Sequence, residues 1–321
     1  MAKTRTTNEE KRLLTKVSSL YYEHDCNQQL IADRLHLSRP KVSRLLKKAR
    51  QIGIVQISVK KHQEYFLELE NELEDKFNLK EAVIFKINAE ATQDSVRNQI
   101  GAASAEYLYR TVGKGETIGV TWGTTLQAMA DAMINNPIPD THVIQALGGV
   151  GPPEAKAHAT DISRRFSQLL ESKLSLLPAP GIVGSAAAKE ALLADRQVKN
   201  TLAFFSKIDT LFVGIGAMST NPVLDKNSEE IAPKAHQELL QSEAVGDISL
   251  RFFNNDGEEV ESEMKDLVIG ISIKEIKAVD TVVGVASGKE KGAAIRGALN
   301  GQLIDVLITD SITAQEICSN N

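Results

Sequence analysis

Six short, almost continuously apolar segments recur between Glu81 and Asp310, and amphipathic segments separate them. A strand that is apolar at nearly every position is buried on both faces, and helices between such strands cover both sides of a parallel sheet. This alternation predicts an α/β domain over residues 81–321, with a doubly wound, mostly parallel, Rossmann-like sheet. Ligands of such domains bind at the carboxyl ends of the strands. The predicted strands are EAVIFKI, ETIGVTW, THVIQAL, DTLFVGIG, TVVGVAS and DVLITD.

The segments between these strands have helical periodicity. We predict helices over TQDSVRNQIGAASAEYLYR, TTLQAMADAMI, ATDISRRFSQLLESKL and KEKGAAIRGALNG. The segment GDISLRFFNNDGEEV is different, because NNDG is a turn signal that follows an apolar pair. It predicts a hairpin.

Charge is distributed unevenly along the 321 residues. Residues 1–62 contain 14 Lys and Arg against 5 Asp and Glu, a net charge of +9. The remaining residues contain 23 against 37, a net charge of −14. This asymmetry suggests a basic module for a polyanion, joined to a body with another role. A basic surface that only contacts water would have the same composition, so the pattern of the residues has to distinguish these two interpretations.

Three helices separated by short turns are predicted in the first 60 residues. The first covers residues 8–24, and Asn27 and Ser38 are suitable N-caps for the second and third. Pro40 falls in the first turn of the third helix, where its missing N–H costs nothing, and Gly53 can end that helix in the left-handed conformation. The apolar stripe of the third helix is predicted to be Val42, Leu45, Leu46, Ala49 and Ile52.

The third helix is basic on the side away from its apolar stripe. Two short helices joined by a tight turn, the second of them basic, are typical of a helix-turn-helix. The alternating segment IVQISVK that follows predicts a strand in the position of a wing. Residues 1–60 are therefore predicted to form a (winged) helix-turn-helix DNA-binding domain, although a helical hairpin with a solvated basic face is the alternative.

The third helix is expected to enter the major groove, where its first residues reach base edges and later residues meet phosphates. The predicted base-reading residues are Arg39, Lys41, Ser43 and Arg44. The predicted phosphate contacts are Lys47, Lys48 and Arg50. Gln28 and Gln29 are predicted to touch the DNA backbone, and Ser38 completes the set of DNA-binding candidates.

Residues 61–80 are predicted to form a connector helix that is acidic except for one apolar face. Phe66, Leu69, Leu73 and Phe77 are spaced by three or four residues along it. This face could pack on the body, or it could be the seam of a short dimer coil. Helix-turn-helix proteins usually bind paired half-sites as dimers, so the dimer seam is favoured.

One loop in the body is suited to an anion. In GVTWGTTL a strand runs into Gly123, Thr124 and Thr125, which open a helix. A glycine lets the backbone approach closely, two hydroxyls can donate, and the helix N-terminus adds N–H groups. An ordinary strand-to-helix turn has the same residues, and no Walker G-K-[ST] follows, so nucleotide hydrolysis is disfavoured.

Further candidate ligand contacts follow other predicted strands. They are Gln145 and Gly148 in QALGGVG, His158 at a helix start, Asp247 in the predicted hairpin, and Lys289 after TVVGVAS. Each has a simpler explanation as a flexible loop, a cap, a turn or a solvated side chain. A lysine at a helix start can meet phosphate as a point charge.

Neither a catalytic set nor a cofactor or metal motif is found in the sequence. The two cysteines, Cys26 and Cys318, lie at opposite ends without metal-ligand spacing, and no G-x-S-x-G elbow occurs. The N-terminus lacks the apolar region of a secretory signal, and no uncharged apolar run reaches membrane-spanning length. We expect a cytoplasmic protein that binds rather than catalyses, with no cofactor and no metal.

Taken together, the segments resemble the SorC family of bacterial sugar-responsive transcriptional regulators, a group that includes the deoxyribonucleoside and central glycolytic regulators. The resemblance covers nearly the whole chain. It rests on the order and spacing of LYYEHDCNQQLIADRLHLSRPKVSRLLKKARQIGIV, IGVTWGTTL, LPAPGIV, VGDISLRFF, VIGIS and LIDVLITDSITA.

The resemblance implies an effector domain related to sugar-phosphate isomerases and glucosamine-phosphate deaminases, without their catalysis. It implies a phosphorylated sugar as effector, and a homodimer or dimer of dimers on operator DNA. Gly123, Thr124 and Thr125 match the family's phosphate loop, while His158, Asp247 and Lys289 match other effector contacts.

The chain departs from the family at one effector loop. Where some relatives carry Lys or Arg before Gly148, this chain has Leu147, which predicts a reversibly bound monophosphate rather than a bisphosphate. The alternative function is a sugar-phosphate isomerase or deaminase-like enzyme with an accessory DNA-binding module, with His158 or Asp247 as its base.

Overall fold

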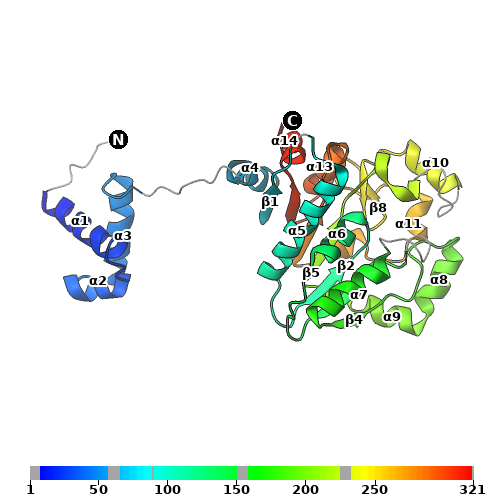
Figure 1. The fold of residues 1–321 in the computed structure, drawn as a ribbon, viewed down its shortest axis with the longest axis horizontal. Helices are drawn as coiled ribbons and strands as arrows, with labels where there is room; N and C mark the ends of the chain where they lie inside the picture. Colours follow the sequence, from blue (N-terminus) through cyan, green and yellow to red (C-terminus); the bar gives the residue numbers. More distant parts are fainter. Residues whose placement is uncertain (1–7, 57–65, 89, 150–157, 225–232, 320–321) are drawn as a thin grey trace. The chain divides into compact units, whose positions relative to one another are not determined.

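A computed structural model describes residues 8–56, 66–88, 90–149, 158–224 and 233–319. The chain divides into two compact units, Met1–His62 and Gln63–Asn321. We call the first unit the head and the second the body (Figure 1). Helix α4 thus belongs with the body, although the sequence predicted a separate connector over residues 61–80.

The head consists of three helices, α1 (Asn8–Tyr22), α2 (Gln28–Leu35) and α3 (Arg39–Gln51), as predicted. Asn27 caps α2, because its side-chain oxygen accepts a hydrogen bond from the backbone N–H of Leu30 at 2.9 Å. The helices enclose a core of their own, whose fully buried members include Leu14, Val17, Ile31, Val42 and Ala49.

The ends of α3 agree with the prediction at Pro40 and Gly53 and differ from it at Ser38 and Ile52. Ser38 occupies the N-cap position but makes no side-chain capping bond, while Pro40 lies in the first turn as predicted. Gly53 is left-handed, with φ +79°, as predicted. Ile52 is 43% exposed, because the helix ends at Gln51 and its periodicity no longer applies. Of the predicted strand over residues 54–60, residues 54–56 form no strand and the others lie outside the described residues.

The body contains a sheet of seven parallel strands in the order β1-β10-β9-β5-β2-β3-β4. Each of the six strands predicted from apolar runs is present. The strands are β1 (Glu81–Phe85), β2 (Thr117–Val120), β3 (His142–Gln145), β4 (Lys173–Ser175), β5 (Thr210–Gly214), β9 (Thr281–Val285) and β10 (Val306–Asp310). Strand β4 lies at the end of a segment predicted as helix; α7 ends at Leu170, and the next residues pair with β3 instead.

Both faces of this sheet are buried, which explains the continuous apolar runs. Along β5, Leu211 and Val213 belong to one core cluster, while Phe212 between them belongs to the cluster on the other face. Successive side chains of a strand point to opposite faces, so both positions need apolar residues. The prediction of a doubly wound, mostly parallel sheet is confirmed.

Helices cover both faces of the sheet (Figure 1). Helices α5, α6 and α7 contribute to the cluster that contains Phe212, and α4, α13 and α14 contribute to the cluster that contains Leu211. The body helices are α4 (Leu67–Phe77), α5 (Gln93–Thr111), α6 (Thr124–Ala132), α7 (Ala159–Leu170), α8 (Ala186–Ala194), α9 (Arg196–Leu202), α10 (Pro233–Gln241), α11 (Glu263–Leu267), α12 (Ile273–Ile276), α13 (Gly292–Asn300) and α14 (Ser311–Ser319). Short 3-10 turns include η4 (Lys289–Lys291).

A small antiparallel sheet, β6 (Gly216–Ala217), β7 (Gly246–Ile248) and β8 (Arg251–Phe253), follows β5. The predicted hairpin is present, but β7 and β8 are joined by Ser249 and Leu250, both left-handed, with φ +54° and +61°. The NNDG segment makes a second turn after β8, in which the Asn254 side chain accepts from the N–H groups of Asp256 and Glu258.

Helix α4 packs against the body, which is the alternative to the dimer seam that the sequence left open. Leu73 is fully buried within the same chain, and Phe66, Leu69 and Phe77 pack around that core. The carboxylates of Glu74 and Glu70 accept hydrogen bonds from the N–H groups of Ala82 and Ile84, at 2.9 and 3.0 Å. Because β1 is an edge strand, α4 occupies N–H groups that would otherwise be open to another strand.

Candidate functional site

The strand order identifies the part of the sheet edge where a ligand would bind. From β2 the chain proceeds to β3 and β4 in one direction, and from β5 to β9 and β10 in the other. Strands β2 and β5 are neighbours, so the connections after them diverge. A crevice opens at such a switch point, outside the carboxyl ends of the strands, and ligands of open α/β sheets bind there.

The predicted anion loop lies at this switch point. Gly123 follows β2 at the N-cap position of α6, with φ +117°, a conformation that disfavours any other residue. No atom lies within 4 Å of where a Cβ would be, so the backbone conformation is what requires glycine here. Thr124 and Thr125 form the first turn of α6, at the positive end of its helix dipole.

A cavity of about 260 Å³ contains two of the predicted ligand contacts, Thr125 and Lys289. It opens beside the ends of β1, β9 and β10 and the first turns of α5 and α14. Its apolar lining includes Ile87, Val96 and Ile100, and its polar lining includes Arg97, Asp310 and Thr313. The cavity thus joins α6, which follows β2, to the loop after β9, and its size is just below the ~300–1,000 Å³ of typical ligand pockets.

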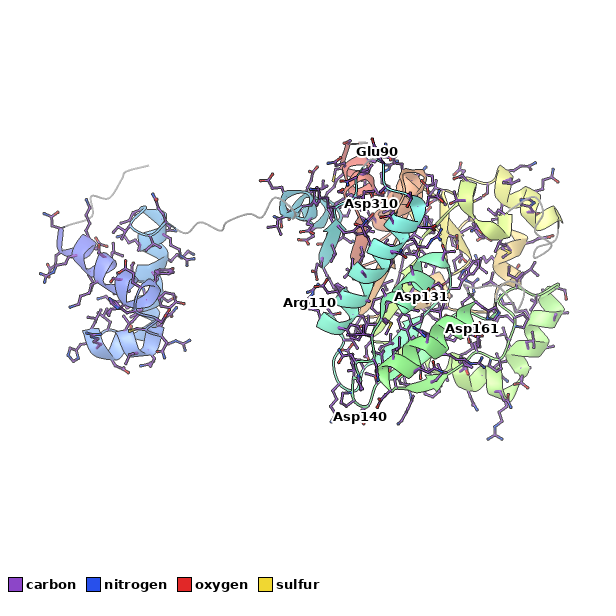
Figure 2. All side chains as sticks on the ribbon, viewed as in Figure 1. Glu90, Arg110, Asp131, Asp140, Asp161 and Asp310 are labelled. Atoms are coloured by element: carbon purple, nitrogen blue, oxygen red, sulfur yellow. The ribbon has the colours of Figure 1, made fainter. Side chains whose placement is uncertain are left out.

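Arg97 and Asp310 were missed by the sequence analysis. Arg97 lies in a helix whose sequence has no anion-binding pattern, and its Nη1 is 3.0 Å from Asp94 Oδ1. Asp310 is the last residue of β10 (Figure 2). Its exposed fraction is 1%. A carboxylate at the carboxyl end of a buried strand, followed by Ser and Thr, was the available signal, because such a residue caps the next helix.

Gln145 is the last residue of β3, and Gly148 and His158 follow it in the chain. Gln145 is fully buried; its Nε2 donates to the Leu147 carbonyl at 2.8 Å, and its Oε1 accepts from Thr160 Oγ1 at 3.4 Å. His158 caps α7, with its Nδ1 accepting from the Thr160 N–H at 3.4 Å. The bond between Gln145 and Thr160 joins the end of β3 to the first turn of α7.

Two glycines in this loop are fixed by close packing. A Cβ on Gly148 would lie 2.6 Å from backbone atoms of Pro180, and one on Gly149 would lie 3.0 Å from the His158 ring. Leu147 is fully buried, so this position of the loop is occupied by core packing and carries no charge.

Asp247 lies beside the end of β5, because β7 pairs with Gly216, two residues beyond that strand. Its Oδ1 accepts from Asn221 Nδ2 at 2.7 Å, and its Oδ2 accepts from the Leu250 N–H at 3.0 Å. A Cβ on Gly216 would lie 2.1 Å from Asp247 Oδ1. The carboxylate therefore secures the left-handed turn after β7.

Burial raises the pKa of Asp247 to about 6, although the two hydrogen bonds and the charge of Lys291 oppose this. Burial in turn lowers the pKa of Lys291, which the charges of Glu290 and Asp247 oppose. Lys291 belongs to the same short turn, η4, as Lys289. Lys291 was not predicted as a site residue, since its distance along the chain from Asp247 gives no sign of proximity.

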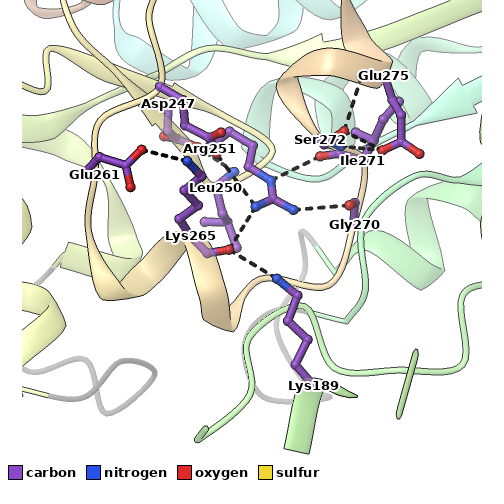
Figure 3. Close-up of polar contacts among 11 residues, drawn as sticks. Lys189, Asp247, Leu250, Arg251, Glu261, Lys265, Gly270, Ile271, Ser272 and Glu275 are labelled. Atoms are coloured by element: carbon purple, nitrogen blue, oxygen red, sulfur yellow. Dashed lines mark hydrogen bonds and ion pairs between the residues drawn. The ribbon is translucent and has the colours of Figure 1, made fainter. Parts of the chain in front are cut away.

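Arg251 is a second buried charge in the hairpin, and it has a structural role (Figure 3). Its guanidinium donates to the carbonyls of Lys265, Ile271 and Gly270, at 3.1, 3.2 and 3.3 Å. Glu259 lies 3.7 Å away. Because Gly270 pairs with Leu147, Arg251 ties strand β8 to the segment that supports the loop after β3.

The predicted DNA-binding residues occupy the exposed side of the head. Arg39, Lys41, Arg44 and Lys47 are exposed, whereas the apolar stripe of α3 from Val42 to Ala49 is buried. The side chain of Lys48 forms an ion pair with Glu10 of α1. Gln29 donates to Asp33 within α2 at 2.9 Å.

The described residues contain no group of three or more His, Cys, Asp or Glu side chains that could hold a metal ion. Among the described helices, none has both the length and the apolar character needed to cross a membrane.

Comparison with known proteins places these features in a family. Residues 61–319 match the family model described as "Putative sugar-binding domain". The Deoxyribonucleoside regulator of Bacillus subtilis (strain 168) is 31% identical over 317 residues, covering 97% of this chain and 99% of that protein. The Sorbitol operon regulator of Klebsiella pneumoniae is 28% identical, covering 95% and 96%.

Solved structures show the same similarity. The crystal structure of the full-length Sorbitol Operon Regulator SorC from Klebsiella pneumoniae matches with a TM-score of 0.73 at 26% identity, covering 97% of this chain and 100% of that one. The putative sugar-binding domain of a transcriptional repressor from Vibrio fischeri matches with a TM-score of 0.72 at 29% identity, covering 79% and 98%.

Proposed function

This chain belongs to the SorC family of transcriptional regulators with a sugar-binding domain, and from that premise we propose that a phosphorylated sugar controls its binding to operator DNA. The observation that carries the proposal is the cavity in which Thr125, Lys289 and Arg97 meet beside the switch point of the sheet. The protein acts as a regulator rather than an enzyme, in keeping with the names of its relatives.

The phosphate would be held by the first turn of α6 and by two cations. The backbone N–H groups after Gly123 and the hydroxyls of Thr124 and Thr125 donate, and the helix dipole favours the negative charge. Lys289 and Arg97, which both line the cavity, would supply positive charge. The sugar would then extend along the sheet edge toward Asp247, Gln145, Gly148 and His158.

A monophosphate suits this arrangement better than a bisphosphate. Leu147, fully buried in the loop after β3, provides no charge for a second phosphate and no amine for a covalent imine. Calorimetry with matched sugar mono- and bisphosphates tests this. Binding of a bisphosphate far more tightly than its monophosphates would contradict it.

The exposed basic side of α3 would contact operator DNA. Arg39, Lys41, Ser43 and Arg44 are exposed and lie near the start of the helix, where base edges are reached in helix-turn-helix complexes. Arg50 and Lys47, on later turns, would meet phosphates, and Lys48 would do so only in competition with Glu10. Gln28, Gln29 and Ser38 would touch the backbone. A homodimer or dimer of dimers would engage paired half-sites.

Fluorescence anisotropy tests both halves of the proposal, DNA binding and its control by a sugar phosphate. The titration uses DNA from upstream of the gene, with and without ribose 5-phosphate, glucose 6-phosphate and related compounds. We expect one compound to change the DNA affinity of the wild-type protein. Thr125→Val should bind DNA normally and weaken the response to that compound about tenfold or more, because a charge-assisted hydrogen bond is lost.

Two variants serve as matched comparisons in the same titration. Thr111→Val removes a hydroxyl from α5 that donates to the Tyr107 carbonyl at 2.8 Å, and should respond as the wild type does. Arg44→Ala should lose about 1–3 kcal/mol of specific DNA affinity. If DNA binding is independent of sequence and Arg44→Ala leaves it unchanged, base reading is refuted. If no sugar phosphate changes the DNA affinity of the wild-type protein, the effector proposal is refuted.

A further inference from the structure

The loop after β9, which carries Lys289, is fastened to a helix that follows a different strand. The N–H of Gly288 donates to Thr313 Oγ1 at 2.9 Å and to Asp310 Oδ2 at 3.2 Å. Gly288 has φ +114°, so the loop turns sharply at this point. The position of Lys289 therefore depends on the first turn of α14 as well as on β9.

Asp310 fixes that first turn. It is 1% exposed, and its Oδ1 accepts from the N–H groups of Ile312 and Thr313, both at 2.9 Å. Its Oδ2 accepts from Thr313 Oγ1 as well as from Gly288. One buried carboxylate with four donors thus holds both the start of α14 and the loop, and Thr313, itself fully buried, closes the network.

The rest of α14 packs against α4. Ala314 and Ile317 are fully buried in the same core cluster as Leu73 of α4. At the end of α14, the Cys318 carbonyl accepts from Lys76 Nζ at 3.4 Å. Figure 1 shows the two helices beside each other at the edge of the sheet formed by β1.

We infer that α14 is the element that links the Lys289 loop to α4, with Asp310 and Thr313 as the positioning residues at its start. Helix α4 is the first described helix of the body, so it is the body helix that lies nearest the head along the sequence. A ligand that draws Lys289 toward the cavity would act on the Gly288 hydrogen bonds. Because interiors are close-packed, a shift of α14 would be passed to Leu73.

The first test needs no ligand. In hydrogen–deuterium exchange of the full chain, Thr313→Val should speed exchange about tenfold both in residues 287–292 and in α4, because both buried hydrogen bonds of the Thr313 hydroxyl are lost. Thr313→Ser keeps the hydroxyl and should restore slow exchange. Ser319→Ala removes an exposed hydroxyl at the other end of α14 and should change neither segment.

Faster exchange confined to the loop, with α4 at the wild-type rate, would overturn the inference. So would unchanged exchange in both segments. If Thr313→Val fails to fold, Asp310→Asn gives the same comparison, since it keeps the shape of the side chain and weakens its bond to Gly288.

The second test rests on the proposed function. With the sugar phosphate that most stabilises the wild-type protein in a thermal-shift screen, Ile317→Ala, which loosens the packing of α14 on α4 outside the cavity, should bind that compound within about threefold of wild type but lose about tenfold in its effect on DNA affinity. A full DNA response from Ile317→Ala would overturn the coupling. If no compound affects wild-type DNA binding, the proposed effector function fails, while the ligand-free exchange experiment still decides the role of α14.

Discussion

Replacing Leu73 by alanine should destabilise the body without involving a second copy of the chain. Leu73 is fully buried and packs in one cluster with Ala314 and Ile317 of α14. A buried leucine truncated to alanine costs about 2.7–5 kcal/mol, because transfer free energy is lost and a cavity remains. We expect a loss in this range for the free energy of unfolding of the body.

Urea unfolding of the full chain, followed by the fluorescence of Trp122, measures this loss. Trp122 is the only tryptophan in the chain and lies in the body, so its signal is not mixed with unfolding of the head. The matched control is Leu67→Ala in the same helix, where the side chain is 41% exposed and the loss should stay below about 1 kcal/mol.

Protein concentration separates this reasoning from a dimer seam. If Leu73 packs within its own chain, the difference between wild type and Leu73→Ala should be the same at two concentrations about a hundredfold apart. A difference under about 1 kcal/mol, or one that disappears on dilution, would refute the packing of α4 on the body.

Two further predictions concern charge. Burial raises the folded-state pKa of Asp247 to about 6 from its ordinary 3.8, so the folded state binds this proton more tightly than the unfolded state does. The free energy of unfolding should therefore fall as pH rises from about 4 to 6, by up to about 3 kcal/mol. Asp247→Asn should flatten that part of the curve of urea midpoint against pH, and an unchanged curve would contradict the burial argument. Lys47→Met should reduce the slope of log K for DNA binding against log salt concentration by about 1. Lys48→Met should reduce this slope less, since Lys48 is already paired with Glu10. Equal slopes for the two variants would contradict this reasoning.

Local sequence patterns determined most of the secondary structure. The alternation of Leu211, Phe212 and Val213 between two faces required only the period of a strand, and both faces had to be apolar in a covered parallel sheet. Asn27 before α2 and Gly53 after α3 act through bonds or dihedral angles within a few residues. The candidate loop at Gly123 could be selected for the same reason, because a strand, a glycine and two threonines are adjacent in sequence.

Patterns of this kind failed where the deciding interaction came from elsewhere in the fold. β4 is a strand because β3 offers it an open edge, and Ile52 is exposed because α3 has already ended. The apolar face of α4 is the same in sequence whether it meets a second chain or Ala314 and Ile317 of its own. Only the packed structure distinguishes these cases.

The sequence by itself thus determined the two-part organisation, the parallel sheet and the loop at Gly123, since each follows from residues close together in the chain. The tertiary structure decided which distant residues meet: Arg97 with Lys289 in one cavity, and Asp310 with Gly288 in one hydrogen-bond network. Strand order brings these residues together, and strand order depends on long-range pairing that no local pattern records.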